Sequence, residues 1–451
     1  MEIIQTILAT VVTLGVLVSV HEFGHFWVAR RCGIKVLRFS IGFGQPLFKW
    51  SDSSGTEYVI ALIPLGGYVK MLDEREGEVA PDDLDFAFNR QSVGKRIAVV
   101  IAGPAANFLF AILAYWWVFV SGVTTVVPVI GVVQPGSLAD QAGLMPGYEI
   151  RAVDTVQTAT WQAINIQLFH HMGETGSVSI NARPFEGGIE KIYPIRLHEW
   201  MMGEEQPDPL VSLGIEPYRP VIPARLGAVM PEEAAAQAGL VEDDLIVAVQ
   251  GIAIDDWQGL VQVIRAHPQQ EIELEIERQG RLFTQMVTPG QRMAQDRVPI
   301  GYLGVAAKNV AWPDAMQREI SYPIYAAWVP ALEKTWDMTV LTLVSLKKML
   351  VGLISIKNLS GPITIAKVAG ASADRGAETF LNFLAYISIS LGLINIMPIP
   401  VLDGGHLLYY FAELVRGKPV PEKIQLVGQK IGLAIIAALM FLAIYNDLVR
   451  L

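Results

Sequence analysis

Cysteine is nearly absent from this chain: Cys32 is the one cysteine among 451 residues. A disulfide-stabilised scaffold is therefore excluded, and cysteine usage does not indicate the redox compartment. Charge is scarce as well, since 17% of the residues are charged, where a soluble domain carries about 25%. The formal charge of −10 argues against nucleic acid as a partner, because phosphate binding needs clustered Lys and Arg.

Apolar residues are abundant instead, at 52% of the chain, and the mean hydropathy is +0.39. A membrane-spanning helix needs roughly 20 mostly apolar residues. Four segments meet this requirement: 3–20 with its continuation to 29, 97–120, 380–399 and 427–445. A cleaved signal peptide fits the first poorly, because no Lys or Arg precedes it and no small-residue cleavage site follows. The sequence predicts a multi-pass α-helical membrane protein with four transmembrane helices.

Lys and Arg are spread unevenly between the loops. Residues 30–96 hold ten of them, whereas 1–29 and 97–150 hold none. Because cytoplasmic loops are enriched in Lys and Arg, 30–96 and 400–430 are expected in the cytoplasm. Both termini and the insert 122–320, with 25 acidic and 13 basic residues, are expected on the opposite side of the membrane. Charges flank the short apolar run within 322–360, which favours an amphipathic helix at the outer interface.

The acidic insert contains an internal repeat. A shift of 96 residues places 131–162 on its counterpart with 13 identities in 32 ungapped positions. Two copies of one domain are therefore predicted. Residues 137–144 and their counterpart resemble the core of a bacterial PDZ domain, which implies two tandem periplasmic PDZ domains (α+β) that bind peptide ligands at a sheet edge. Residues 213–215 and 302–305 resemble its carboxylate-binding loop, although ordinary strands closing each domain are the alternative.

A metal-binding pattern ends the first apolar run: His21-Glu22-Phe23-Gly24-His25 matches H-E-x-x-H. On a helix, positions i and i+4 share a face, so both imidazoles can reach one ion, while Glu22 can take a proton from metal-bound water. A chance match is the alternative. His21 lies nine residues before Arg30, roughly 13 Å along a helix, so the motif is expected inside the bilayer, where such groups need a partner or a function.

Catalytic zinc takes three protein ligands and keeps an open position, so a further intramembrane ligand is needed. Residues 395–406 read Asn-Ile-Met-Pro-Ile-Pro-Val-Leu-Asp-Gly-Gly-His, and the two prolines break the third span. Asp403 follows this break directly and is the favoured third ligand. His406, one turn further, is the competing candidate. The other histidines lie in the insert, across the membrane from the motif: His170, His171, His198 and His267.

These two motifs resemble those of the site-2 protease family of intramembrane zinc metalloproteases, and the tandem insert and the length of the chain strengthen the likeness. The resemblance implies that His21, His25 and Asp403 bind Zn²⁺ and that Glu22 is the general base. It implies that Asn395 holds the substrate backbone. The break, with Pro398 and Pro400, is expected to give water and peptide access to the site.

Residues 55–71 are apolar and β-prone, with Leu-Gly-Gly-Tyr at 65–68 near the expected turn. The resemblance implies a cytoplasmic-side, membrane-reentrant β-hairpin whose Gly66, Gly67 and Tyr68 contact the substrate. Such pairing would expose peptide bonds that a helical substrate hides. A plain cytoplasmic hairpin is the alternative.

The predicted organisation has nine parts. They are the first transmembrane helix (1–30), the loop with the reentrant hairpin (31–96), the second transmembrane helix (97–121), the two PDZ domains (122–220 and 221–310), the interfacial segment (311–378), the third transmembrane helix (379–404), a cytoplasmic loop (405–426) and the fourth transmembrane helix (427–446).

The sequence thus predicts an intramembrane zinc endopeptidase that carries out regulated intramembrane proteolysis of pre-trimmed single-pass membrane proteins. By the resemblance, its substrates include an anti-sigma factor of the envelope-stress response and remnant signal peptides. A membrane-anchored PDZ scaffold with a vestigial metal site is the first alternative, disfavoured by the intact Glu22. A zinc transporter is the second, disfavoured because the metal-binding groups cluster on one side of the membrane.

Overall fold

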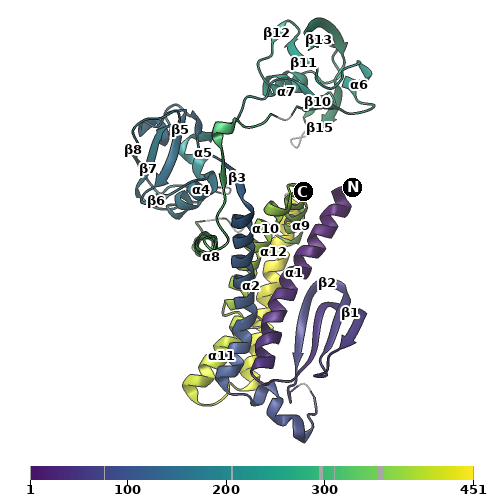
Figure 1. Ribbon diagram of the computed structural model, residues 1–451, viewed down its shortest axis with the longest axis vertical. Helices are drawn as coiled ribbons and strands as arrows, with labels where there is room; N and C mark the ends of the chain where they lie inside the picture. The colour runs from purple at the N-terminus through teal and green to yellow at the C-terminus, as the bar shows by residue number, and fades with distance from the viewer. Residues whose placement is uncertain are drawn as a thin grey trace.

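The computed structural model describes residues 2–75, 77–204, 207–293, 298–308, 310–353, 355, 357 and 359–449. Within these ranges four helices are long and apolar enough to cross a membrane. They are α1 (Glu2–Arg31), α2 (Val93–Ser121), α10 (Ala377–Ile396) and α12 (Glu422–Val449). All four run along the long axis of the molecule (Figure 1). The four predicted spans overlap these helices, but α2 and α12 begin four and five residues earlier than predicted, and α10 ends three residues before the predicted end at 399.

Helix α2 lies at the centre of this bundle and packs against both α1 and α10. Small residues allow the close approach: a Cβ on Gly24 of α1 would lie 2.2 Å from the carbonyl oxygen of Ala102 on α2. On the other side, Gly392 of α10 faces Pro104 and Phe108 of α2. Membrane helices associate through such small-residue contacts, because lipid provides no hydrophobic drive between them.

A β-hairpin follows α1 and lies beside it (Figure 1), made of β1 (Val36–Ser51) and β2 (Glu57–Met71). The turn lies at 52–56, where Asp52 Oδ1 accepts hydrogen bonds from the amides of Ser54 and Thr56. The register also reverses the chain direction between Ile63 and Gly67, close to the turn predicted near 65–68, so the sequence missed the turn at 52–56 but not this reversal. Both strands bend, so β1 pairs through 36–41 with 67–71 on one edge and with 57–60 on the other.

Two extramembrane units follow α2. The first comprises β4 (Ile130–Val133), α3 (Leu138–Gln141), β5 (Tyr148–Val153), β6 (Val156–Gln157), α4 (Trp161–His170), β7 (Gly176–Pro184), β8 (Lys191–Leu197), α5 (Pro209–Leu213) and β9 (Ile215–Pro217). The second comprises β10 (Leu226–Val229), α6 (Ala234–Gln237), β11 (Leu245–Val249), β12 (Ile252–Ala253), α7 (Trp257–Ala266), β13 (Ile272–Arg278), β14 (Arg281–Val287), β15 (Gly290–Met293), β16 (Pro299–Tyr302) and β17 (Val305–Ala307). Each has its own apolar core.

The two units share their order of elements. The first has a four-stranded sheet in the order β6-β5-β7-β8, and the second has β12-β11-β13-β14. Equivalent residues also cap equivalent helices: the side chain of Thr160 accepts from the amide of Ala163, and that of Asp256 accepts from the amide of Gly259. The units differ before their last strand, where the first has helix α5 and the second has the β15–β16 hairpin.

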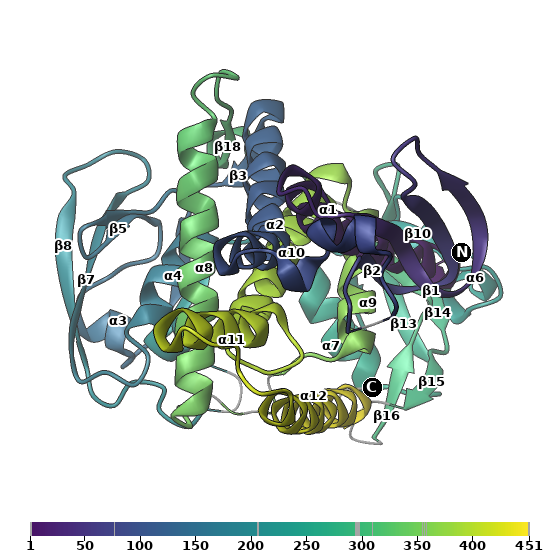
Figure 2. The same ribbon diagram turned by 90° about the horizontal axis from the view of Figure 1, so that it is seen from below.

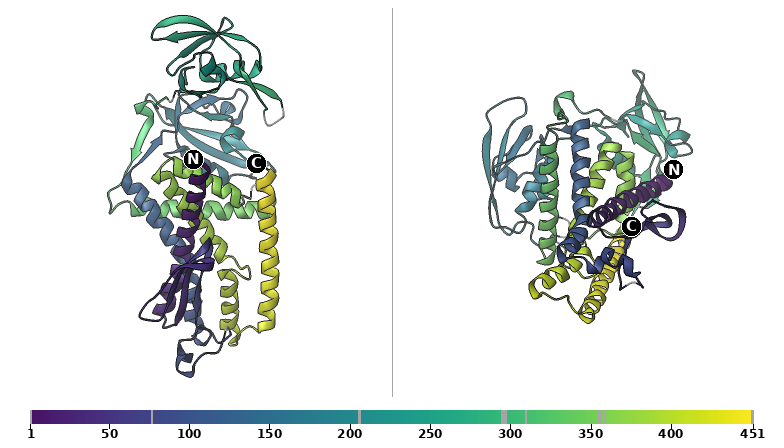
Figure 3. Two further views of the ribbon diagram at one scale, coloured as in Figure 1. Left: turned by 90° about the vertical axis from the view of Figure 1, so that its right-hand side faces the viewer. Right: turned by 60° about the horizontal axis from the view of Figure 1, so that its bottom comes forward.

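A two-stranded ribbon joins this insert to the bundle. Strand β3 (Val123–Val126), directly after α2, pairs with β18 (Gln317–Ile320). Helix α8 (Trp328–Leu350) then lies across the long axis: in Figure 2, seen from below, it runs lengthwise while α12 is foreshortened. It is not among the four candidate spans. Figure 3 shows α8 near the ends of the spanning helices where the chain termini lie, beneath the extramembrane units.

The remaining helices close the bundle at its two ends. Helix α9 (Pro362–Asp374) packs against α1 and α12 near the chain termini, and α11 (Asp403–Arg416) packs against α2 at the opposite end. Most of the loop predicted at 405–426 is therefore the helix α11. Short 3₁₀ helices in the described ranges include η1 (Pro81–Phe86), η2 (Phe88–Arg90) and η3 (Asp314–Met316).

Candidate metal centre

Three side chains from two helices meet inside the bundle. His21 and His25 lie one turn apart on α1, and Asp403 is the first residue of α11. The two Nε2 atoms lie 3.2 Å apart, and Asp403 Oδ2 lies 3.2 Å from that of His21 and 3.5 Å from that of His25. Among the described residues they form the one group of three metal-binding side chains whose ligand atoms all lie within 4.8 Å.

The non-helical segment between α10 and α11 brings Asp403 to the histidines. Helix α10 ends at Ile396, and α11 starts at Asp403. A Cβ on Gly404 would lie 2.1 Å from the carbonyl oxygen of Met397, so only glycine lets α11 start against this segment. Val401 adopts φ +93°, a conformation that costs a β-branched residue free energy. This local strain accompanies the placement of Asp403.

Helix α2 backs both imidazoles. Val99 O lies 2.8 Å from His25 Nδ1, and Asn107 Nδ2 lies 3.1 Å from His21 Nδ1. Pro104 lacks the amide hydrogen that would bond within this part of α2, which loosens the helix around these contacts. A Cβ on Gly103 would lie 2.3 Å from His25 Nε2 and 2.9 Å from His21 Cε1. Glycine is therefore required here for the rings to lie against the helix.

The donor set fits a zinc ion. His25 gives its Nδ1 hydrogen to Val99, so its Nε2 atom carries a lone pair toward the other two ligand atoms. Asp403 Oδ2 is buried without a hydrogen-bond partner. In a tetrahedral site with bonds of about 2.0–2.1 Å, ligand atoms lie roughly 3.3 Å apart. The observed separations of 3.2, 3.2 and 3.5 Å match this value.

A cavity of about 760 Å³ opens from this centre. Glu22 lines it, next to His21 and beside β2: a Cβ on Gly67 would lie 3.3 Å from Glu22 Cγ and 2.6 Å from the carbonyl oxygen of Ser40. Residues 67–71 of β2 pair with β1 on one edge, and Gly67, Tyr68, Val69 and Met71 line the cavity. An extended strand edge thus lies beside the metal centre.

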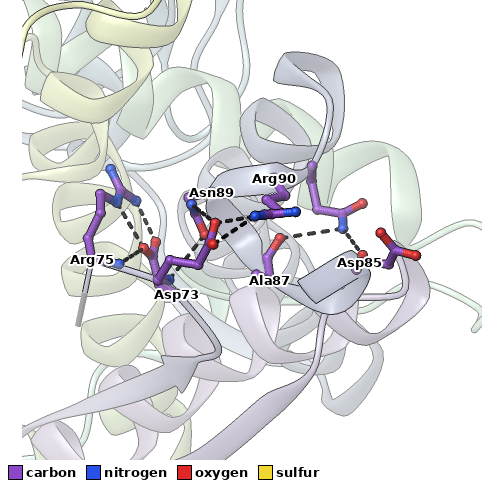
Figure 4. Close-up of polar contacts among 8 residues, drawn as sticks. Asp73, Arg75, Asp85, Ala87, Asn89 and Arg90 are labelled. Atoms are coloured by element: carbon purple, nitrogen blue, oxygen red, sulfur yellow. Dashed lines mark hydrogen bonds and ion pairs between the residues drawn. The ribbon is translucent and has the colours of Figure 1, made fainter. Parts of the chain in front are cut away.

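Further charged residues also line this cavity. Asp73 and Arg75 form an ion pair there, next to the network of Glu74 with Asn89 and Arg90 (Figure 4). His406 lines the same cavity from α11. Burial lowers the pKa of His406 from its usual value; the nearby Asp403 carboxylate opposes this shift, and Arg75 adds to it. His406 therefore favours its neutral form.

The structure gathers some of the predicted site residues and not others. His21, Glu22, His25, Gly67, Tyr68 and Asp403 line one cavity. Gly66 packs against the ring of Phe43 instead, and Asn395, Pro398 and Pro400 are not among the lining residues. Pro400 contacts α12, where a Cβ on Gly432 would collide with its carbonyl oxygen.

Sequence reasoning missed the contribution of α2. Gly103, Pro104 and Asn107 stand out in the sequence as irregularities within an apolar span, but nothing local links them to the histidines. The cost of a polar side chain in a membrane is the one signal that could have marked Asn107 as a partner of the site.

Comparison with known proteins agrees with this geometry. The family model described as peptidase family M50 matches residues 9–439. The chain is 46% identical over 441 residues to the regulator of sigma-E protease RseP of Escherichia coli, covering 98% of each chain. It is 45% identical over 451 residues to the protein of that name from Salmonella typhimurium, and 46% identical over 451 residues to a Vibrio cholerae protein provisionally named a zinc metalloprotease, covering 100% of each chain in both cases.

The predicted resemblance to the site-2 proteases is thereby confirmed, and with it the assignment as a zinc metalloprotease. The HExxH helix and the aspartate after the broken helix lie together in a chain that, over nearly its whole length, belongs to peptidase family M50.

Proposed function

We propose that this protease cuts membrane-spanning segments of its substrates within the bilayer, near the cytoplasmic side. The observation that carries the proposal is the position of His21 and His25: both lie on a candidate membrane-spanning helix, and both approach Asp403 within 3.5 Å. Intramembrane groups of this kind are costly unless they serve a function. A metalloprotease site at this depth acts on peptide bonds that lie within the membrane.

His21, His25 and Asp403 are the zinc ligands in this proposal. When bound, zinc acts as a Lewis acid on the scissile carbonyl and on water. If the Asn107 amide turns by 180°, its Oδ1 atom, which now has no partner, accepts the Nδ1 hydrogen of His21. Both imidazoles then present Nε2 to the metal, as second partners of metal-bound histidines generally ensure.

Glu22 is the general base. It lies in the cavity, next to His21 in sequence and against Gly67 of β2. Its carboxylate takes a proton from the attacking water and passes that proton to the nitrogen of the leaving amine, so that the C–N bond breaks without releasing a charged amide. Proton transfer by a positioned side chain contributes roughly 10²–10⁴-fold to rate.

The test is Glu22→Gln in purified protein, with Glu78→Gln as the control at an exposed loop position. Cleavage of a single-span substrate in liposomes should fall by about 10²–10⁴-fold, with the zinc content unchanged, because the amide cannot accept the proton. A membrane-anchored scaffold would keep its function in this variant. Full cleavage by Glu22→Gln would reject the assignment of the base.

The substrate is proposed to add as a strand to 67–71 of β2. This edge is backbone that can pair with an unwound segment, and it lies beside Glu22. Gly67 and Tyr68 then contact the substrate directly. Gly66, Asn395, Pro398 and Pro400 would act on the substrate from outside the cavity, Asn395 by hydrogen-bonding its backbone.

The proposed topology puts the hairpin, α11 and the metal centre toward the cytoplasm, and both termini and the two units in the periplasm. The uneven distribution of Lys and Arg supports it, as does the aromatic cluster of Trp116 and Trp328 beside α8 at the opposite end of α2. Single cysteines introduced at exposed Ser53 and Glu186 in a Cys32→Ser background test it. An impermeant maleimide should label position 186 in spheroplasts, and position 53 only after lysis; the reverse would invert the topology.

The two extramembrane units are proposed to be tandem PDZ domains. Their shared order of strands and helices, and the left-handed glycines Gly214 and Gly304 before β9 and β17, support this assignment. In the proposed topology they lie across the membrane from the catalytic site. They therefore control which substrates reach that site and take no part in the chemistry. We infer that they exclude substrates with bulky outer domains and admit pre-trimmed ones.

Deleting residues 127–306 tests this filter. The deletion removes the units and leaves β3 and β18, which still pair near the end of α2. The deletion protein should cut trimmed substrate at the parent rate and should also cut untrimmed substrate. Loss of all cleavage by a zinc-loaded, well-folded deletion protein would instead assign the units to substrate delivery.

The names of the relatives suggest the substrate. By their name, the regulator of sigma-E proteases take part in the regulation of sigma-E. By similarity, the partner proposed for this chain is a single-pass anti-sigma factor in the bacterial inner membrane, with remnant signal peptides as a second substrate class. A zinc transporter is not favoured, because the family assignment is to peptidases.

A further inference from the structure

We infer that Arg96 and Glu413 are positioning residues that hold Asp403 at the metal centre. Arg96 of α2 donates from Nη2 to Glu413 Oε1 of α11 at 2.7 Å, and from Nε to the carbonyl oxygen of Gln91 at 3.1 Å. Its guanidinium also lies 4.8 Å from the ring centroid of Tyr410. This inference rests on the proposed assignment of Asp403 as a zinc ligand.

The pair is in register with the metal centre. Arg96 precedes Gly103 by seven residues on α2, and Tyr410 follows Asp403 by seven residues on α11. Seven residues make about two helical turns and roughly 10 Å. The two helices therefore meet at two levels. At one, the imidazoles lie against Gly103 and approach Asp403; at the other, Arg96 holds Tyr410 and Glu413.

Contacts at two levels fix the orientation of α11 against α2, which a contact at one level would not do. The seam between α2 and α11 is otherwise a small apolar cluster with Val100, Leu407 and Tyr410 at its centre. Apolar contacts of this size allow a helix to rotate or slide, whereas the ion pair sets both its angle and its height. The side chains of Arg96 and Glu413 are only 10% and 14% exposed.

The burial of the Arg96–Glu413 ion pair supports its role in positioning α11. A buried ion pair contributes little net stability, because desolvation offsets the attraction, and its best-attested use is to specify register. Here register decides whether Asp403 Oδ2 stays 3.2 Å from His21 Nε2. The carbonyl oxygen of Gln91 holds Arg96 from the other side, and the side chain of Gln91 donates to the carbonyl oxygens of Asp85 and Ala87.

The test is the zinc affinity of detergent-purified variants, measured by competition with a chelating dye. Glu413→Gln should bind zinc about tenfold more weakly, at the low end of the 10–100-fold range for partners outside the ligand set. It should also lower kcat with KM unchanged. Arg416→Gln removes an exposed charge one turn further along α11 and should change neither quantity.

Rescue separates positioning from mere stability. The exchange Arg96→Glu with Glu413→Arg should bind zinc more tightly than Arg96→Glu alone, because opposite charges again face each other, although the hydrogen bond to Gln91 and the contact with the Tyr410 ring are lost. Arg96→Lys keeps the charge but loses the planar fork, so it should give a smaller loss, and it serves if Glu413→Gln folds poorly.

Parent-like zinc affinity in Glu413→Gln, with a lowered unfolding temperature, would overturn the inference. Asp403→Ala shows whether the assignment of Asp403 as a ligand has failed or only the inference about Arg96 and Glu413. If that variant keeps zinc, the ligand assignment is wrong and the inference falls with it. If it loses zinc while Glu413→Gln and Arg96→Lys keep it, only the inference is rejected.

Discussion

Gly103→Ala should weaken zinc binding by about 100-fold or more and abolish cleavage, although it adds one methyl group. The new Cβ would sit 2.3 Å from His25 Nε2 and 2.9 Å from His21 Cε1. Comfortable contacts between such atoms need about 3.5 Å, so at least one ring must move by roughly 1 Å. A misplacement of this size can cost about 10²-fold in rate.

The matched control lies on the same helix. Gly94→Ala adds the same methyl group to α2, where no heavy atom lies within 4 Å of the new Cβ. It should leave zinc affinity and cleavage unchanged and slightly favour the helix. The measurement is zinc content after dialysis, together with the cleavage rate. Equal zinc retention in Gly103→Ala and Gly94→Ala would show that the imidazoles do not bind the metal in the observed arrangement.

Local patterns predicted the parts of the site that depend on one helix. The i, i+4 spacing of His21 and His25 is a property of α1 alone. Asp403 could be selected because the prolines before it break a span at the same depth. The arrangement of the break itself could not be predicted, since it depends on Gly404 and Gly405 lying against carbonyl groups of the preceding segment.

The sequence located one of the two chain reversals that bound residues 57–63 and missed the other. Gly66 and Gly67 suggest a turn by composition, yet Gly67 is there because Ser40 and Val18 leave no room for a side chain. The turn at 52–56 carried its own signal: Asp52 followed by Ser and Gly can bond the backbone amides two and four residues on. The sequence does not show that residues 36–41 lie between 57–60 and 67–71, because this pairing joins distant parts of the chain.

Helix α11 forms in a segment that was predicted to be a loop. Two glycines at its start and charged residues beyond argue for a loop, as predicted for 405–426. In the structure Leu407 and Tyr410 pack with Val100 of α2, and this burial stabilises the helix. Tertiary contacts commonly override weak local propensity in this way. The backing of the imidazoles by Val99 and Asn107 is likewise a contact between distant residues that no local pattern contains.

Asp403→Ala should remove the third ligand and with it the metal. The carboxylate oxygen lies 3.2 and 3.5 Å from the two Nε2 atoms, and no hydrogen bond satisfies it. Loss of a ligand should cost more than the 10–100-fold typical of partners outside the ligand set, so we expect zinc affinity to fall by more than about 100-fold. Cleavage should fall below detection.

His406→Ala is the matched control. Its imidazole lines the same cavity one turn further along α11, but it does not belong to the group of ligand atoms that lie within 4.8 Å of one another. The central measurement is therefore the zinc stoichiometry of purified Asp403→Ala beside His406→Ala, taken with the cleavage rate of each. The proposed site predicts zinc near zero in Asp403→Ala and near one per chain in His406→Ala. Full zinc and cleavage in Asp403→Ala, with both lost in His406→Ala, would contradict it.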